Sequence, residues 1–169
     1  METKPFIEPV ICDDFFPNPM EIREWALNKE YVDRKQDPKK GNFPGKRTDY
    51  ISSLNPDLFR EITERVYSVM NRAYGLNLDA TSTSHTEMHF QWCSKHDGTS
   101  WVHVDSDRKW THVGVIYLTP NPPADSGTKL YHRPEGYDPD MKNPIESDFE
   151  VKEVLDNQFN RMVMYDPRE

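Results

Sequence analysis

Histidine and carboxylate side chains at short spacing are the groups in this sequence best suited to hold a metal ion. His103 and Asp105 are two residues apart in a stretch whose alternating pattern is typical of a strand. Residues two apart on a strand point to the same face, with Cα atoms about 6.6 Å apart, so a nitrogen and an oxygen can converge on one ion. An imidazole and a carboxylate so placed are two of the three ligands of a 2-His-1-carboxylate Fe(II) site.

A second group of metal-binding residue types has an unsuitable spacing. It consists of His85, His89, Cys93 and His96. In a strand, residues four apart lie about 13 Å from one another, whereas zinc needs its ligands about 2 Å from the ion. The Thr, Phe and Trp residues of this stretch favour a strand over a helix. We therefore interpret these side chains as solvated or structurally hydrogen-bonded.

The charge balance limits the partners of the chain. Its 169 residues include 21 basic and 29 acidic ones, which leaves a net charge of −8. This balance disfavours nucleic acid and anionic membranes as partners, because both require a positive face. The polar segment 33–49 carries a local basic cluster, and it predicts either a solvated loop or a lid over a substrate. If the chain is an enzyme, a small molecule or a protein is the expected substrate.

The remaining composition indicates where in the cell the protein is expected and that its chain folds. No apolar run approaches the roughly 20 residues that span a bilayer, and the first residues lack the pattern of a secretory signal. Cys12 and Cys93 are too few for a disulfide framework. The aromatic content of 12% indicates a folded chain. We predict a cytoplasmic protein.

Two helices are expected in the first half of the chain. Asn18 and Pro19 begin the first one, since Asn caps a helix well and Pro is tolerated at its first position. The second begins at Asn55-Pro56 and ends near Gly75. One stripe of this helix is apolar and consists of Leu58, Phe59, Ile62, Val66 and Met70.

Beyond Gly75 the hydrophobic period changes from 3.6 to two, which indicates strands. The strands expected there are 88–92, 101–105, 113–117, one around Gly127-Thr128, and 161–165, in addition to a short one at 10–12 in the first half. Asp97-Gly98 and Asp125-Ser126-Gly127 are turn signals. Helices followed by strands predict a mainly β domain with a helical cover.

Two segments, SKHDGTSWVHVDSD and WTHVGVIYLTPNPPADSGTKLY, resemble the prolyl-hydroxylase-like branch of the Fe(II)/2-oxoglutarate oxygenases. In that family a glycine-containing turn precedes His-x-Asp, and a Tyr-Leu-(Asn/Thr)-Pro strand and a Gly-Thr strand follow. The opening ICDDFFPNPMEIREWAL is also similar, and a branch found in phages and bacteria is the nearest in pattern. The matching positions are Gly98, His103, Asp105, Tyr117 to Pro120, and Gly127-Thr128.

The resemblance implies a fold and a reaction. The fold would be a double-stranded β-helix, a cupin-like jelly roll, with the N-terminal helices packed on one sheet. Residues 1–169 would be one domain, with 1–75 as the cover and 76–169 as the jelly-roll strands. His103 and Asp105 would bind Fe(II), and Tyr117 and Gln91 would contact 2-oxoglutarate. The activity would be that of a dioxygenase that hydroxylates a C–H bond.

Two family positions have no match here. The family carries a second histidine, and further on an arginine, after the strand that residues 161–166 resemble. Three explanations are open: a longer native chain, completion by a partner chain, or a non-catalytic jelly-roll module with a vestigial metal site. His132 and His112 lie upstream, in the wrong part of the family pattern, and are disfavoured as substitute third ligands. A cupin-like metalloenzyme without 2-oxoglutarate is disfavoured because His-x-His is absent. We expect little turnover from these 169 residues and more from a C-terminally extended chain.

Overall fold

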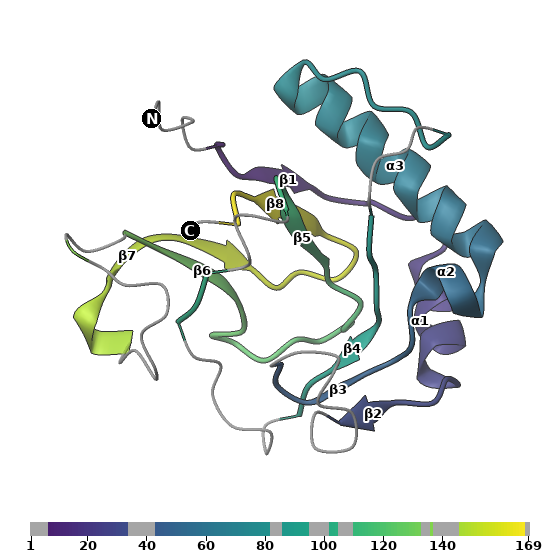
Figure 1. The fold of residues 1–169 in the computed structure, drawn as a ribbon. Coiled ribbons are helices and arrows are strands. Elements are labelled where there is room, and N and C mark those ends of the chain that lie inside the picture. The colour runs from purple at the N-terminus through teal and green to yellow at the C-terminus, as the bar shows by residue number, and fades with distance from the viewer. Residues whose placement is uncertain are drawn as a thin grey trace. The chain divides into compact units, whose positions relative to one another are not determined.

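Figure 1 shows a computed structural model of the chain, which describes residues 7–33, 43–81, 86–94, 102–104, 110–132, 136 and 146–167. The chain divides into two compact units. The first unit consists of residues 1–20 and 101–169, and the second unit of residues 21–100. The boundary expected near residue 75 lies within the second unit. The described segments form three α-helices and several small antiparallel sheets, a mixed architecture, and these sheets do not close into a barrel.

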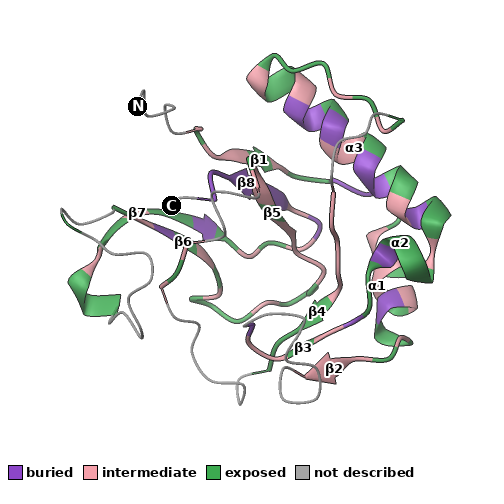
Figure 2. Cartoon of the chain, viewed as in Figure 1, coloured by how far each residue is buried: buried purple, intermediate pink, exposed green. Residues whose placement is uncertain are grey.

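A three-stranded antiparallel sheet joins the two ends of the chain in the first unit. Its order is β1 (Val10–Cys12), β8 (Met162–Tyr165) and β5 (Val113–Ile116). All four residues of the central strand β8 are buried, as the purple segment of Figure 2 shows. Gly114 is required on β5, because a Cβ there would lie 2.8 Å from the Val163 carbonyl oxygen. The strands predicted at 10–12, 113–117 and 161–165 are confirmed to within one residue.

The other sheet of the first unit is a two-stranded ribbon. It pairs β6 (Gly127–His132) with β7 (Glu150–Asp156), which follows the 3-10 helix η2 (Glu146–Asp148), and a register shift lies at Leu130/Tyr131. Leu130 and Leu155 of the ribbon pack with Val163 and Tyr165 of β8. The two sheets of this unit therefore share one core. In the chain, the β6–β7 pair is nested inside the β5–β8 pair.

The turn before β8 is held by Asn160, which adopts a left-handed backbone with φ of 63°. Its side chain accepts a hydrogen bond from the Phe16 amide at 2.9 Å and donates one to the Phe16 carbonyl at 2.9 Å. Its backbone accepts from the Phe15 amide at 3.0 Å and donates to the Tyr117 carbonyl at 2.8 Å. One buried residue thus fixes three segments that are distant in sequence.

The helices are α1 (Pro19–Leu27), α2 (Ile51–Leu54) and α3 (Pro56–Tyr74). The predicted limits of α3 are confirmed. The Asn55 side chain accepts a hydrogen bond from the Leu58 amide at 3.1 Å, and Gly75 ends the helix with φ of 64°. Figure 2 shows the buried stripe along α3. The buried residues of α3 are Leu58, Ile62, Thr63, Tyr67, Val69 and Met70. The buried face therefore includes Tyr67 and Val69, which were not predicted, and not Phe59 and Val66, which were.

The sheet of the second unit was largely missed from the sequence. It joins β2 (Val32–Asp33), β3 (Lys46–Arg47) and β4 (Gln91–Trp92) in antiparallel order. The predicted loop 33–49 thus contains β3, and the predicted strand 88–92 is regular only at 91–92. Two-residue strands are too short to show a period of two. The segment 86–90 is still tied by hydrogen bonds from Thr48 N to Phe90 O and from Ile51 N to Met88 O.

The strand predicted at 101–105 falls partly outside the described residues. Residues 102–104 are described and lie in no regular strand. Within the parts of the chain that the structure describes, no helix is both long and apolar enough to cross a membrane.

Candidate functional site

Of the two predicted metal ligands, the structure describes only His103. His103 is exposed and takes part in an interaction, whereas Asp105 lies outside the described residues, as do His85 and His96. Within the described segments, no group of three or more His, Cys, Asp or Glu residues could hold a metal ion. The convergence of His103 and Asp105 on one ion stays a prediction.

Tyr117 directly follows β5 and is held at both its backbone and its hydroxyl. Its amide donates to the Arg161 carbonyl at 2.9 Å, and its ring packs against the shared core of the first unit. Its hydroxyl lies 2.8 Å from Thr128 Oγ1 and donates to the Leu155 carbonyl across a longer 3.4 Å. Burial raises the pKa of Tyr117, although the Thr128 hydrogen bond acts in the opposite direction. The phenol therefore stays protonated near neutral pH and can donate.

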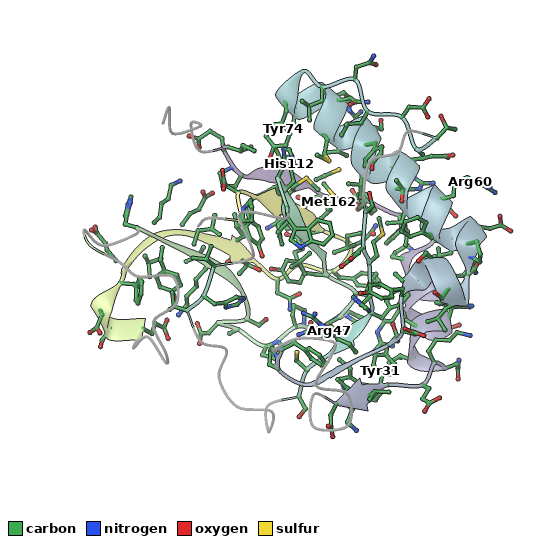
Figure 3. All side chains as sticks on the ribbon, viewed as in Figure 1. Tyr31, Arg47, Arg60, Tyr74, His112 and Met162 are labelled. Carbon is green, nitrogen blue, oxygen red and sulfur yellow. The ribbon has the colours of Figure 1, made fainter. Side chains whose placement is uncertain are left out.

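Gln91 belongs to the second unit, on β4. Its Oε1 accepts a hydrogen bond from Arg47 Nε at 2.8 Å, and its Nε2 donates to the Pro44 carbonyl at 3.1 Å. The Arg47 guanidinium lies 4.5 Å above the Phe43 ring, and Figure 3 shows Arg47 on β3. Both ends of the Gln91 amide thus join β4 to β3 and the residues before it. Contact of Gln91 with 2-oxoglutarate stays a prediction.

The remaining histidine and cysteine of the zinc-like group have local partners in the second unit. His89 Nδ1 lies 3.1 Å from the Thr48 carbonyl, and its ring lies 4.3 Å from the Tyr50 ring. Cys93 is exposed, and its Sγ lies 3.2 Å from Gln91 Nε2. For His89, the expected structural hydrogen bond is confirmed.

His112 is a second titratable histidine of the first unit, besides the predicted ligand His103. It directly precedes β5 (Figure 3), and its Nδ1 lies 2.9 Å from Thr111 Oγ1. Burial lowers the pKa of His112, and the negative charge of Asp166 partly offsets this. Asp166 directly follows β8, is 1% exposed and accepts a hydrogen bond from the Ile7 amide at 3.2 Å. The pairing of β5 with β8 brings the two residues near each other, which no local pattern signals.

Chemically, the described residues offer an imidazole at His103, a hydroxyl pair at Tyr117 and Thr128, and an imidazole near a carboxylate at His112 and Asp166. Comparison with protein-family models, curated proteins and solved structures found no match to this chain. The function must therefore be argued from these residues and from the way in which the strands pair.

Proposed function

We propose that the chain is the oxygenase domain of an Fe(II)- and 2-oxoglutarate-dependent hydroxylase. The observation that carries the proposal is the nested pairing in the first unit, where β6–β7 lies inside β5–β8 and the two sheets share one core. Nesting of one antiparallel strand pair inside another is the connectivity expected of part of a jelly roll. β5 and β6 also lie within the segment 110–132, most of which resembles the family in sequence, and β8 coincides with the family strand that residues 161–166 resemble.

The donor types at the predicted metal site fit Fe(II). A neutral imidazole from His103 and a carboxylate from Asp105 match the ligand preference of non-haem iron. When bound, the iron would supply the oxidation of a C–H bond by dioxygen and 2-oxoglutarate. The chain itself would hold the ion through His103 and Asp105.

Tyr117 has the protonation and support to bind a carboxylate. Either Tyr117 or Thr128 can be the donor in their 2.8 Å hydrogen bond. When Thr128 donates, the phenolic proton is left with only the 3.4 Å contact to the Leu155 carbonyl, which is a weak bond. That proton is then available to a carboxylate of the co-substrate. Thr128 would thus fix the direction in which Tyr117 donates.

Metal binding tests the proposal directly. Mn(II), a redox-stable substitute for Fe(II), should bind the wild-type chain saturably in isothermal titration calorimetry. His103→Ala and Asp105→Ala should each weaken this binding by about tenfold or more, because each removes one ligand. Asp148→Ala, which removes an exposed carboxylate of the same unit, is the matched control and should bind Mn(II) like the wild type. Equal binding by all four proteins would remove the pair from the site.

The co-substrate is tested separately. In the presence of Mn(II), 2-oxoglutarate should bind the wild type more tightly than it binds Tyr117→Phe, by about 3–10-fold for one lost hydrogen bond. Gln91→Ala gives the corresponding test for Gln91. His132→Ala examines the alternative ligand, and a loss of Mn(II) binding there would place His132 in the site. Failure of the wild type to bind Mn(II) would favour the non-catalytic module.

A further inference from the structure

The sheet of the second unit carries an exposed pair of aromatic rings, Trp92 and Tyr31, which we call the aromatic platform. At 51%, Trp92 on β4 is the most exposed large apolar side chain that the structure describes. Tyr31 directly precedes β2 and is labelled in Figure 3. The two ring centroids are 5.8 Å apart and the ring planes are nearly perpendicular, at 85°. Half of Trp92 therefore stays open to solvent beside a fixed aromatic neighbour.

Both rings of the platform are held from behind. The Tyr31 hydroxyl donates a hydrogen bond to the Ala26 carbonyl of α1 at 3.1 Å. Trp92 pairs with Lys46 of β3, and the preceding Gly45 lets the two strands approach closely. Gly45 has φ of 69°, and a Cβ there would collide with the Trp92 carbonyl oxygen. A pre-formed platform loses little entropy when a ligand binds.

A lysine lies directly beside the platform. Asp33, Lys46 and Trp92 are opposite one another on the three strands, so their side chains share one face of the sheet. Lys46 is exposed, and its ammonium has no hydrogen bond or ion pair within the described segments. Asp33 lies on the side of Lys46 away from Trp92, is half-buried and takes part in an interaction of its own. The ammonium is therefore available to an anionic group on the Trp92 side.

The negative charge that disfavours nucleic acid for the whole chain belongs to the other unit. Residues 1–20 and 101–169 contain nine basic and seventeen acidic residues, whereas residues 21–100 contain twelve of each. The sequence around the platform is basic, since residues 29–47 include seven basic and three acidic ones. Positive charge raises the local concentration of anionic partners. The charge near the platform thus favours an anionic ligand.

We propose that this face of the second unit binds single-stranded nucleic acid, with one base stacked on Trp92 and the adjacent phosphate on Lys46. Every base has a π face that an exposed indole can stack on, and a lysine ammonium neutralises a phosphate. A neutral sugar could also stack on Trp92, but it would leave the Lys46 ammonium without an anion. In a duplex the bases are already stacked on one another and cannot reach the indole. The proposal does not depend on the metal site.

The probe is a short fluorescein-labelled oligothymidylate, titrated with the full chain at low ionic strength and followed by fluorescence anisotropy. The wild type should bind it saturably. Trp92→Ala should weaken binding by about tenfold, and Trp92→Phe by less, because Phe keeps a ring for stacking. Lys46→Gln should weaken binding and reduce the slope of log affinity against log salt concentration by about 0.7, the value for one phosphate contact with a single strand. Circular dichroism checks that each variant is folded.

Two controls separate the platform from general charge. Arg72→Gln removes one positive charge from an exposed position of α3 in the same unit, and it should bind the probe within about twofold of the wild type. The oligothymidylate–oligoadenylate duplex should bind about tenfold more weakly than the single strand. Lys46→Gln changes an exposed side chain and keeps the test decisive if Trp92→Ala unfolds. No saturable binding by the wild type, equal binding of the duplex, or an equal loss in Arg72→Gln and Lys46→Gln would overturn the proposal.

Discussion

The two units of the chain differ in how far apart in sequence their contacting residues are. The second unit is one continuous stretch, residues 21–100, and its longest element, α3, is capped by its immediate neighbours Asn55 and Gly75. The first unit combines residues 1–20 with residues 101–169, and its central strand β8 pairs with β1 from the opposite end of the chain. Local signals therefore determine much of the second unit, whereas long-range pairing determines the first.

The units also differ in how they use polar residues. In the first unit, Asn160 and Asp166 are buried and bond to backbone groups of residues 7–16. In the second unit, polar side chains mostly bond within a few residues, as in the Asn55 cap and the Arg65–Glu61 pair of α3. Thr48 is the exception, since it is fully buried and accepts a hydrogen bond from the Phe90 amide. A buried polar group is expensive to leave unpaired. The first unit should therefore be more sensitive to polar substitution.

The largest expected effects come from matched core truncations. Leu155 is fully buried in the first unit and Ile62 is 2% exposed in the second. Leu155→Ala and Ile62→Ala should each lower the free energy of unfolding by about 2–5 kcal/mol. Hydrogen exchange should rise in β1, β5 and β8 for the first variant and in α3 for the second. An equal rise in both units for either variant would show that they unfold together.

Asn160→Ala should cost about 2–4 kcal/mol, because it leaves the Phe16 amide and carbonyl without their partners and places Ala at a positive φ. Urea unfolding measures the loss. Asn160→Gly is the control, since it removes the same hydrogen bonds but accepts the left-handed backbone. It should be more stable than the Ala variant by up to about 1 kcal/mol. Wild-type stability of Asn160→Ala would contradict the role of this residue.

In the second unit the corresponding polar substitution should be milder. Asn55→Ala removes the acceptor for the Leu58 amide at the exposed start of α3, where water can replace it, and should cost about 1 kcal/mol. Asn55→Asp keeps the acceptor and should stay close to the wild type. A loss from Asn55→Ala as large as that from Asn160→Ala would remove the contrast between the units. Urea unfolding again provides the measurement.

The sequence predicted the elements that depend on local signals and missed the pairing of distant strands. Both ends of α3 were predicted, because Asn55, Pro56 and Gly75 act within one turn of the helix. β5 and β8 were predicted as strands, but not as partners, since a period of two identifies a strand without its neighbour. β7 was missed because its residues are mostly charged, with Leu155 alone fully buried.

The candidate sites were also predicted only in part, because they depend on contacts between distant segments. His103 and Asp105 were chosen from residue type and spacing, and the structure describes only His103 of the pair. The hydrogen bond between Tyr117 and Thr128 joins the end of β5 to β6, in two sheets that share one core, and no spacing predicts it. The loop before β6 meets the loop after β7 through the pairing of these two strands, and the hydrogen bond from the Asn157 amide to the Ser126 carbonyl extends that pairing. Such sites emerge only once distant segments are paired.

The smallest expected changes in the free energy of unfolding come from removing one ion pair in each unit. In the first unit, Arg161 donates two hydrogen bonds to Asp13, at 2.6 and 3.0 Å, with the Arg161 side chain only 15% exposed. In the second unit, Arg60 and Asp57 are 64% and 85% exposed on α3, and Figure 3 labels Arg60. Asp13→Asn should cost about 0.5–1 kcal/mol at neutral pH, because the carboxylate is itself half-exposed and solvent screens the pair. Asp57→Asn should cost close to zero.

The pH dependence of stability shows whether the Arg161–Asp13 pair stabilises the fold through charge or through packing. The hydrogen bonds from Arg161 lower the pKa of Asp13 below its ordinary value of 3.8. A carboxyl group with a lowered folded-state pKa stabilises the fold above its unfolded pKa, and this contribution is lost as pH falls through the folded value. Urea midpoints of the wild type and Asp13→Asn should therefore differ at pH 7 and converge below pH 3.8. A difference that persists at low pH would show that Asp13 stabilises the first unit through packing and not through charge.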